Sequence, residues 1–216
     1  IQAAGERQAV FFNTTFAVMG HVAKASGHVT EADIRVATLL MDKMQLTGRA
    51  RQEAQEAFRS GRQSGFDLFK QLADFKRVTQ SRHELLQMFL EIQIQTALSD
   101  GELQEKEQQV LAVIAEQLGM SGVLNDLLSR WQAEFQHHQS RHGSKMSIKD
   151  AYLVLGIDDS VSDQQIKRAY RKLMNEHHPD KLVAKGLPEE MMMLAKDKAQ
   201  DIQAAYEAIK TSRGMR

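Results

Sequence analysis

A histidine, a proline and an aspartate stand together at positions 178–180, directly after a strongly basic stretch. Pro179 has no N–H and disfavours helical angles at His178, so we expect a helix to end here in a turn. That turn would display an imidazole and a carboxylate beside the cations of the helix, which indicates a surface that binds the charge of a partner. We predict no role for His177, because a His-His pair is not a metal site without distant ligands. The predicted partner-binding residues are His178, Pro179, Asp180, Lys167, Arg168, Arg171, Lys172 and Lys181.

Acidic residues gather at a second place, on both sides of Gly101. Carboxylate oxygens are the donors that hard cations prefer. Carboxylates near the start of a helix also cap it and favour its dipole, and the spacing here does not follow the Asp-x-Asp-x-Asp-Gly pattern of calcium loops. Two interpretations stay open, a divalent-metal site or a set of capping side chains. The residues concerned are Asp100, Glu102, Glu105 and Glu107.

The elements that hold these residues are expected to be helices throughout. The chain contains only two prolines, Pro179 and Pro188, and shows few strand-like alternations. Ile166, Tyr170 and Leu173 are spaced four and three apart, so they share one face of the helix that carries the cations. The predicted fold class is all-α, with an N-terminal helical bundle and a C-terminal helical hairpin.

Composition excludes several classes of protein. The 216 residues have a formal net charge of 0, which gives no electrostatic case for nucleic acid. The chain has 0 cysteines, so it has neither a disulfide scaffold nor a Cys-ligated zinc site. No stretch approaches the ~18 apolar residues of a membrane span. We find neither a phosphate-binding loop nor a set of nucleophile, base and orienting group, so we do not expect an enzyme.

The N-terminal part contains an internal repeat. The sequence around Gly27 recurs 74 residues later around Gly101, each time as a helix, a glycine turn and an amphipathic helix. The glycine supplies the positive φ that ends the first helix. Thr30 and Gln104 then stand near the start of the second helix, each followed by an acidic residue. Two such hairpins with connecting helices are expected to pack as a bundle.

These patterns divide the chain into an N-terminal helical domain (1–135), a flexible polar linker (136–146) and a C-terminal domain (147–216). Residues 136–145 contain no apolar residue, and we interpret their histidines as solvated rather than metal-bound. In the C-terminal domain, a helix that starts near Pro188 would pack antiparallel to the basic helix. A loop over 181–187 would close this hairpin.

Residues 169–181 closely resemble the J-domain of DnaJ-type co-chaperones, in which a Tyr-Arg-Lys-Leu helix precedes His-Pro-Asp. Residues 151–157 and 203–209 resemble the first and third helices of that domain, so the resemblance extends over about residues 147–213. It implies binding to a DnaK-type chaperone and activation of that chaperone's ATPase. The resemblance further implies that Asp180 accepts a charge-assisted hydrogen bond from the chaperone.

The repeat of the N-terminal part resembles the TerB-like helical fold of tellurite-resistance proteins, over about residues 10–133. In that family acidic residues at the glycine turns are linked to divalent metal, although Ser26 and His28 replace acidic residues in the first repeat. A C-terminal J-domain behind such a fold resembles the DjlA-type group of DnaJ-like co-chaperones. That resemblance implies the cytoplasmic side of the bacterial inner membrane, with a membrane anchor before Ile1.

Two functions follow as alternatives. The first is a co-chaperone whose N-terminal domain selects clients or a regulatory partner and which needs no cofactor. The second is a metal-responsive TerB-like regulatory protein. Nucleic acid is not an expected partner, since no known reading motif accompanies the basic helix.

Overall fold

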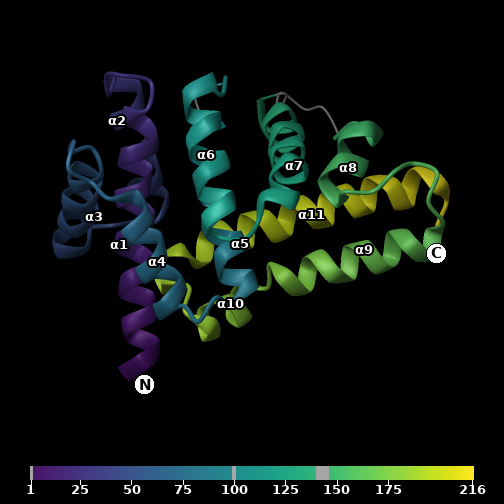
Figure 1. Cartoon of the computed structure of the whole chain (residues 1–216). Coiled ribbons are helices and arrows are strands. Elements are labelled where there is room, and N and C mark those ends of the chain that lie inside the picture. The colour runs from purple at the N-terminus through teal and green to yellow at the C-terminus, as the bar shows by residue number, and fades with distance from the viewer. Residues whose placement is uncertain (1, 99–100, 140–145) are drawn as a thin grey trace.

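The computed structural model describes residues 2–98, 101–139 and 146–216, and within these ranges it contains helices and no strand (Figure 1). The all-α prediction is therefore confirmed. None of the described helices is long and apolar enough to span a membrane. The helices are α1 (Gln2–Lys24), α2 (Glu31–Lys43), α3 (Gly48–Gly61), α4 (Leu68–Val78), α5 (His83–Leu98), α6 (Glu105–Gln117), α7 (Ser121–Gln139), α8 (Ile148–Leu155), α9 (Asp163–Glu176), α10 (Pro179–Lys185) and α11 (Met192–Arg213), with a 3-10 turn η1 (Glu189–Met191) before α11.

The internal repeat corresponds to two helical hairpins, α1–α2 and α5–α6. Gly27 and Gly101 occupy equivalent turns with φ values of 111° and 108°, a region that disfavours any residue with a Cβ. Thr30 begins α2 with a capping box in which the Asp33 carboxylate accepts from the Thr30 backbone N–H. Gln104 begins α6 in the same way, with Glu107 as the acceptor. The two hairpins thus share their turn conformation and their capping chemistry.

An aromatic cluster forms the centre of the N-terminal core. Phe11, Phe75 and Phe89 are fully buried, with ring centroids 5.6 Å apart for Phe11–Phe75 and 4.6 Å apart for Phe75–Phe89. These residues come from α1, α4 and α5, so the cluster fixes the mutual positions of three helices. Helix α10, which belongs to the C-terminal half of the chain, packs beside α5.

The C-terminal helices form the predicted antiparallel hairpin of α9 and α11, which lie side by side in Figure 1. Tyr170 of α9 stacks on Tyr206 of α11, with ring centroids 4.1 Å apart, and Ile166 and Leu173 are buried. The prediction of a loop over 181–187 was wrong for its first part. Residues up to Lys185 continue α10, which begins at Pro179 because proline suits the first position of a helix.

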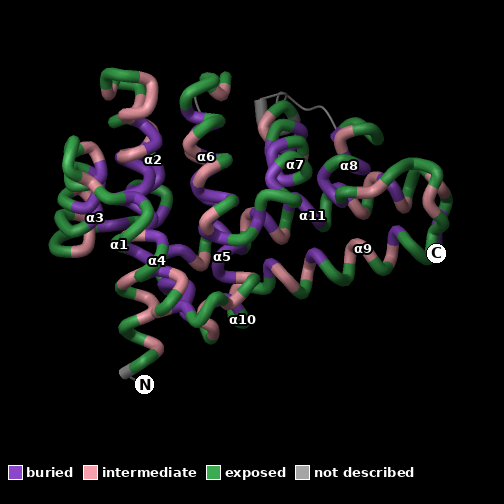
Figure 2. The backbone as a smooth tube through the Cα atoms, in the orientation of Figure 1, coloured by how far each residue is buried: buried purple, intermediate pink, exposed green. Residues whose placement is uncertain are grey.

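Figure 2 shows buried residues in both halves of the chain. They form two clusters that do not follow the predicted domain boundaries. The larger cluster joins N-terminal helices to Leu182, Leu187 and Met191. Helix α7 extends to Gln139, so the start of the predicted linker 136–146 is helical rather than flexible. Residues 140–145 of that linker lie outside the described residues. Because the larger cluster contains residues of both halves, the two halves pack against one another through an apolar core.

Candidate functional site

The His178-Pro179-Asp180 turn forms the start of α10. His178 is the N-cap residue, Pro179 is the first helical residue, and Asp180 lies in the first turn. The side chains of His178 and Asp180 are exposed, while Pro179 is half-buried. The dipole of a helix favours a carboxylate in its first turn, so Asp180 is presented to solvent at a position that suits its charge. The pair can therefore contact a partner without unfolding any element.

Contacts with the N-terminal helices hold α10 in place. Leu182 is buried in the larger core cluster. The Arg7 Nε donates to the Lys185 carbonyl oxygen at 3.1 Å, and the Lys185 Nζ lies 2.8 Å from the Glu84 carboxylate. Helix α10 is thus anchored to α1 and α5, and its orientation is set by both halves of the chain.

His177 makes the most deeply buried of these connections, and the prediction that it has no role was wrong. Its Nε2 lies 2.8 Å from the Glu91 Oε2, and the exposed fractions of the two side chains are 3% and 1%. Its Nδ1 lies 2.9 Å from the Leu173 carbonyl oxygen. Both partners are acceptors, so with Glu91 ionised both ring nitrogens donate and His177 is an imidazolium. The residue next to the exposed turn is therefore tied to α5 by a buried ion pair.

The pKa values of this pair follow from burial and mutual attraction. Burial alone would raise the pKa of Glu91, but the charge and hydrogen bond of His177, together with the charge of Lys198 and a hydrogen bond from Gln87, outweigh it and lower the pKa to about 2. Burial alone would lower the pKa of His177, but Glu91 outweighs it and raises that pKa above its ordinary value of 6.5. The ionised pair is thus the favoured state near neutral pH.

This pair predicts a pH window for stability. The lowered pKa of Glu91 stabilises the fold above the ordinary value of 4.5, and this contribution is lost as pH falls toward about 2. The raised pKa of His177 stabilises the fold below 6.5, and this contribution is lost as pH rises through the folded-state pKa. The melting temperature of the wild-type chain minus that of a Glu91→Leu/His177→Leu double variant should be largest between pH 4.5 and 6.5. A difference that does not change with pH would contradict the ion-pair assignment.

A second buried ion pair joins the halves at α7 and α11. The Lys198 Nζ contacts the Glu134 Oε1, and the exposed fractions of these side chains are 2% and 1%. Lys198 also lies over the Trp131 ring, 4.2 Å from its centroid. Burial raises the pKa of Glu134, against the opposing effect of Lys198. Lys43 of α2 and Asp197 of α11 form a further, partly exposed ion pair at 2.5 Å.

The predicted basic residues of α9 do not all face the same surroundings. Arg168 and Arg171 are exposed. Lys172 lies 3.9 Å from Glu176, and the Lys167 Nζ donates to the Arg216 carbonyl oxygen at 2.9 Å. Lys181, from the first turn of α10, donates to the Asn175 side chain. The two arginines therefore present the cationic charge of α9 most directly to a partner.

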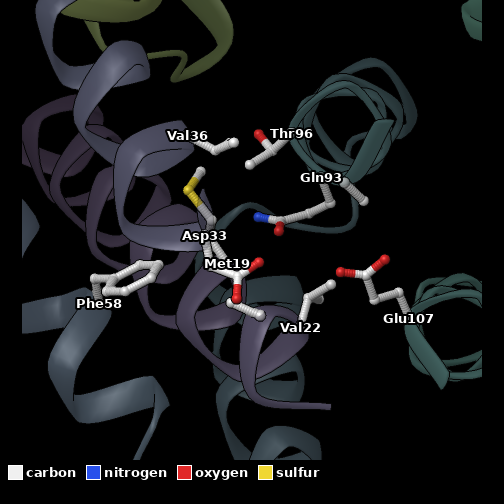
Figure 3. Close-up of a pocket in the computed structure, with 10 residues that line it drawn as sticks. Met19, Val22, Asp33, Val36, Phe58, Gln93, Thr96 and Glu107 are labelled. Atoms are coloured by element: carbon white, nitrogen blue, oxygen red, sulfur yellow. The ribbon is translucent and has the colours of Figure 1, made fainter. Parts of the chain in front are cut away.

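The predicted acidic metal site is only partly described, because Asp100 lies outside the described residues. Glu102 and Glu105 are exposed, whereas Glu107 is buried and caps α6. Figure 3 shows Glu107 beside a cavity of about 20 Å³ that Asp33, its equivalent in the first repeat, also lines. This cavity has room for about one water molecule. For Glu107 the capping interpretation accounts for the hydrogen bond that it accepts from the Gln104 backbone N–H.

Metal binding at this turn stays a prediction with a direct test. In the part of the chain that the structure describes, no group of three or more His, Asp or Glu side chains converges as metal ligands do. A site would therefore need Asp100 together with the neighbouring carboxylates. Under this prediction calcium, magnesium, manganese or zinc should raise the melting temperature. At a hundredfold excess of the ion over its Kd, the free energy of unfolding should rise by about 2.7 kcal/mol. Glu102→Gln/Glu105→Gln should remove that shift, and no shift with any ion would contradict the site.

Comparison with known proteins assigns each half to a family. Residues 13–124 match the family described as "Tellurite resistance protein TerB", and residues 150–214 match the "DnaJ domain" family. A Shewanella oneidensis protein named "Co-chaperone protein DjlA" is 65% identical over 99% of this chain and 82% of its own length. Proteins of the same name from Photobacterium profundum and Yersinia pestis are each 51% identical, over 98% and 97% of this chain and 80% and 82% of their own lengths. No solved structure matches the chain significantly.

Proposed function

Because this chain belongs to the DjlA family of co-chaperones, we propose that its J-domain binds a DnaK-type chaperone and stimulates ATP hydrolysis by that chaperone. The chain itself would not hydrolyse ATP. The observation that carries the proposal is the exposed His178-Pro179-Asp180 turn, which begins α10 inside the segment that matches the DnaJ domain.

Each residue of the turn has a distinct proposed part in the contact. Asp180 accepts a charge-assisted hydrogen bond from a basic group of the chaperone. His178 fixes the turn or donates to the chaperone. Pro179 holds both in position before binding, which lowers the ordering cost of the complex. The cations of α9 and Lys181 attract an acidic surface and raise the association rate.

The N-terminal TerB-like domain has a separate proposed part, the selection of clients or of a regulatory partner. It fits this part because it packs against the J-domain through a shared core and a buried ion pair, so a partner held on it stays near the exposed turn. We further propose that the protein acts on the cytoplasmic side of the bacterial inner membrane, held by an anchor that precedes Ile1. The DjlA family resemblance alone supports this location.

Binding to the chaperone tests the proposal at its first step. An activator of hydrolysis must bind the ATP-bound form, so a labelled chain should bind a bacterial DnaK in the presence of ATP. His178→Gln should weaken this binding while the circular-dichroism spectrum stays that of the wild type, because His178 is exposed. No binding in the presence of ATP would contradict the proposed function.

Charge on α9 should control how fast the complex forms. Arg168 and Arg171 are exposed, so Arg168→Glu/Arg171→Glu should leave the fold intact and lower the association rate by about tenfold at low salt. The deficit should shrink as salt screens the charges. Stopped-flow fluorescence measures both effects.

The matched control for this prediction is Lys149→Glu/Lys196→Glu, which makes the same change of net charge at exposed positions on α8 and α11. It should associate nearly as fast as the wild type. An equal deficit in both double variants would assign the effect to net charge rather than to α9.

A further inference from the structure

A groove on the N-terminal domain contains none of the residues that are proposed to contact the chaperone. It lies between the end of α1, the α3–α4 connection and α6, and it has a volume of about 880 Å³. We propose that this α4–α6 groove (Lys24, Phe66, Phe69, Lys106, Val110 and Val113) binds a client segment in which an apolar side chain is flanked by aspartate or glutamate. This role in client binding rests on the co-chaperone function proposed above.

The floor of the α4–α6 groove is apolar and accessible. The side chain of Phe69 has an exposed fraction of 58%, although α4 buries Leu72 and Phe75 on its other face. Val110 and Val113 of α6 are half-buried and pack against the larger core cluster. Packing of the fold does not require Phe69 to reach solvent, and an exposed aromatic ring beside half-buried apolar side chains offers an anchor for a partner.

The charged side chains that line the groove are mostly basic, which favours a partner with negative charge. Lys24 and Lys106 line the groove, and the one acidic residue of its lining, Asp67, accepts from the Lys70 backbone N–H as the N-cap of α4. Burial lowers the pKa of His21, so this side chain adds no charge at neutral pH.

A second hollow continues the basic surface beyond the groove. It shares Lys24 and Gln63 with the groove and adds Arg59, Arg62 and His28. The chain as a whole has a net charge of 0, so this surface is a local concentration of cations. Its complement is a partner with carboxylates beside its apolar anchor.

The shape favours a protein segment over other occupants. A volume of about 880 Å³ lies within the range of roughly 300–1,000 Å³ that small-molecule sites occupy, and it accommodates a few apolar side chains. Single-stranded nucleic acid would need a row of aromatic side chains on which successive bases stack. Here Phe66 and Phe69 stand beside the aliphatic Val110 and Val113 rather than in a row of aromatic rings, which suits apolar side chains better than successive bases.

Fluorescence anisotropy with two labelled peptides tests the proposal on the full chain. Both peptides carry a Leu-Phe-Leu centre, flanked by glutamates in one and by lysines in the other. We expect the glutamate peptide to bind about tenfold more tightly, with an advantage that salt reduces. Equal affinity for the two peptides would overturn the proposal.

Matched variants locate the binding site. Phe69→Ala should weaken binding of the glutamate peptide by about tenfold. Leu39→Ala should have no effect, since Leu39 has a similar exposed fraction of 59% but lies on α2 outside the groove. Lys24→Glu/Lys106→Glu should reverse the preference between the peptides. Equal losses in Phe69→Ala and Leu39→Ala would overturn the assignment. Displacement of the peptide by an oligonucleotide would also overturn it. So would a concentration-dependent dimer of the chain that Phe69→Ala abolishes.

The experiment also separates this proposal from the co-chaperone function. No residue of the J-domain lines the α4–α6 groove, so Phe69→Ala should stimulate DnaK as the wild type does in the absence of client. Peptide binding that depends on Phe69, without any stimulation of DnaK, would retain the groove and reject the co-chaperone function. Stimulation without peptide binding would do the reverse.

Discussion

Asp180→Asn should abolish the stimulation of a DnaK-type ATPase while leaving the fold intact. The asparagine side chain keeps the size of the aspartate and removes its charge. A hydrogen bond to a charged group contributes about 1.5–3 kcal/mol, which corresponds to about a 10- to 100-fold loss of affinity. Asp180 is exposed, so its neutral replacement should change the melting temperature little.

The control for this variant is Glu190→Gln, which removes a carboxylate from an exposed position on η1 of the same domain. It should stimulate the chaperone as the wild type does. Retained stimulation by Asp180→Asn would refute the role assigned to the turn, and equal losses in both variants would assign the effect to the general charge of the domain.

Glu91→Ala should be the most destabilising of the substitutions considered. It removes the carboxylate that keeps the buried His177 charged and leaves the His177 Nε2 without its partner, in a pair whose side-chain exposed fractions are 3% and 1% in the wild type. Breaking a buried pair in this way costs about 3–5 kcal/mol. Urea unfolding of the purified chain measures the loss directly.

The double variant distinguishes an ion pair from two independent packing effects. Glu91→Leu/His177→Leu replaces both charges by apolar side chains, a change that is often close to neutral in free energy. It should therefore be more stable than either single leucine variant. Losses that simply add would show that Glu91 and His177 are not coupled.

The ion pair also bears on function, because His177 immediately precedes the exposed turn. With Glu91 on α5 as its partner, the N-terminal domain fixes the C-terminal end of α9 and the start of α10. Loss of the pair should loosen this part of the chain before the α9–α11 hairpin itself. The position of the turn is thus a property of both domains.

Local patterns predicted much of the structure. Proline placement predicted the end of α9, and the recurring glycines predicted two hairpins whose turns have nearly the same φ. The capping residues Thr30 and Gln104 were predicted for the same reason, since a cap depends only on neighbours a few residues away. The short helix α10 was missed because its seven residues end at Lys185, directly before Gly186, and show too little periodicity.

Contacts between distant segments could not be predicted in this way. His177 and Glu91 are 86 residues apart, and Lys198 and Glu134 are 64 apart, so no local pattern links them. One signal was present in the sequence: Glu91 is a lone charge in the otherwise uncharged run from Leu85 to Leu98. A charge on such an apolar helix needs a buried partner, although the sequence does not identify which residue provides it.

Single-turnover ATP hydrolysis by a bacterial DnaK, with the intact chain titrated in, tests the central claim most directly. We predict that the hydrolysis rate rises with the concentration of the chain and levels off when the chaperone is saturated. A hydrolysis rate that does not change at concentrations where the two proteins are bound would contradict the proposed co-chaperone function.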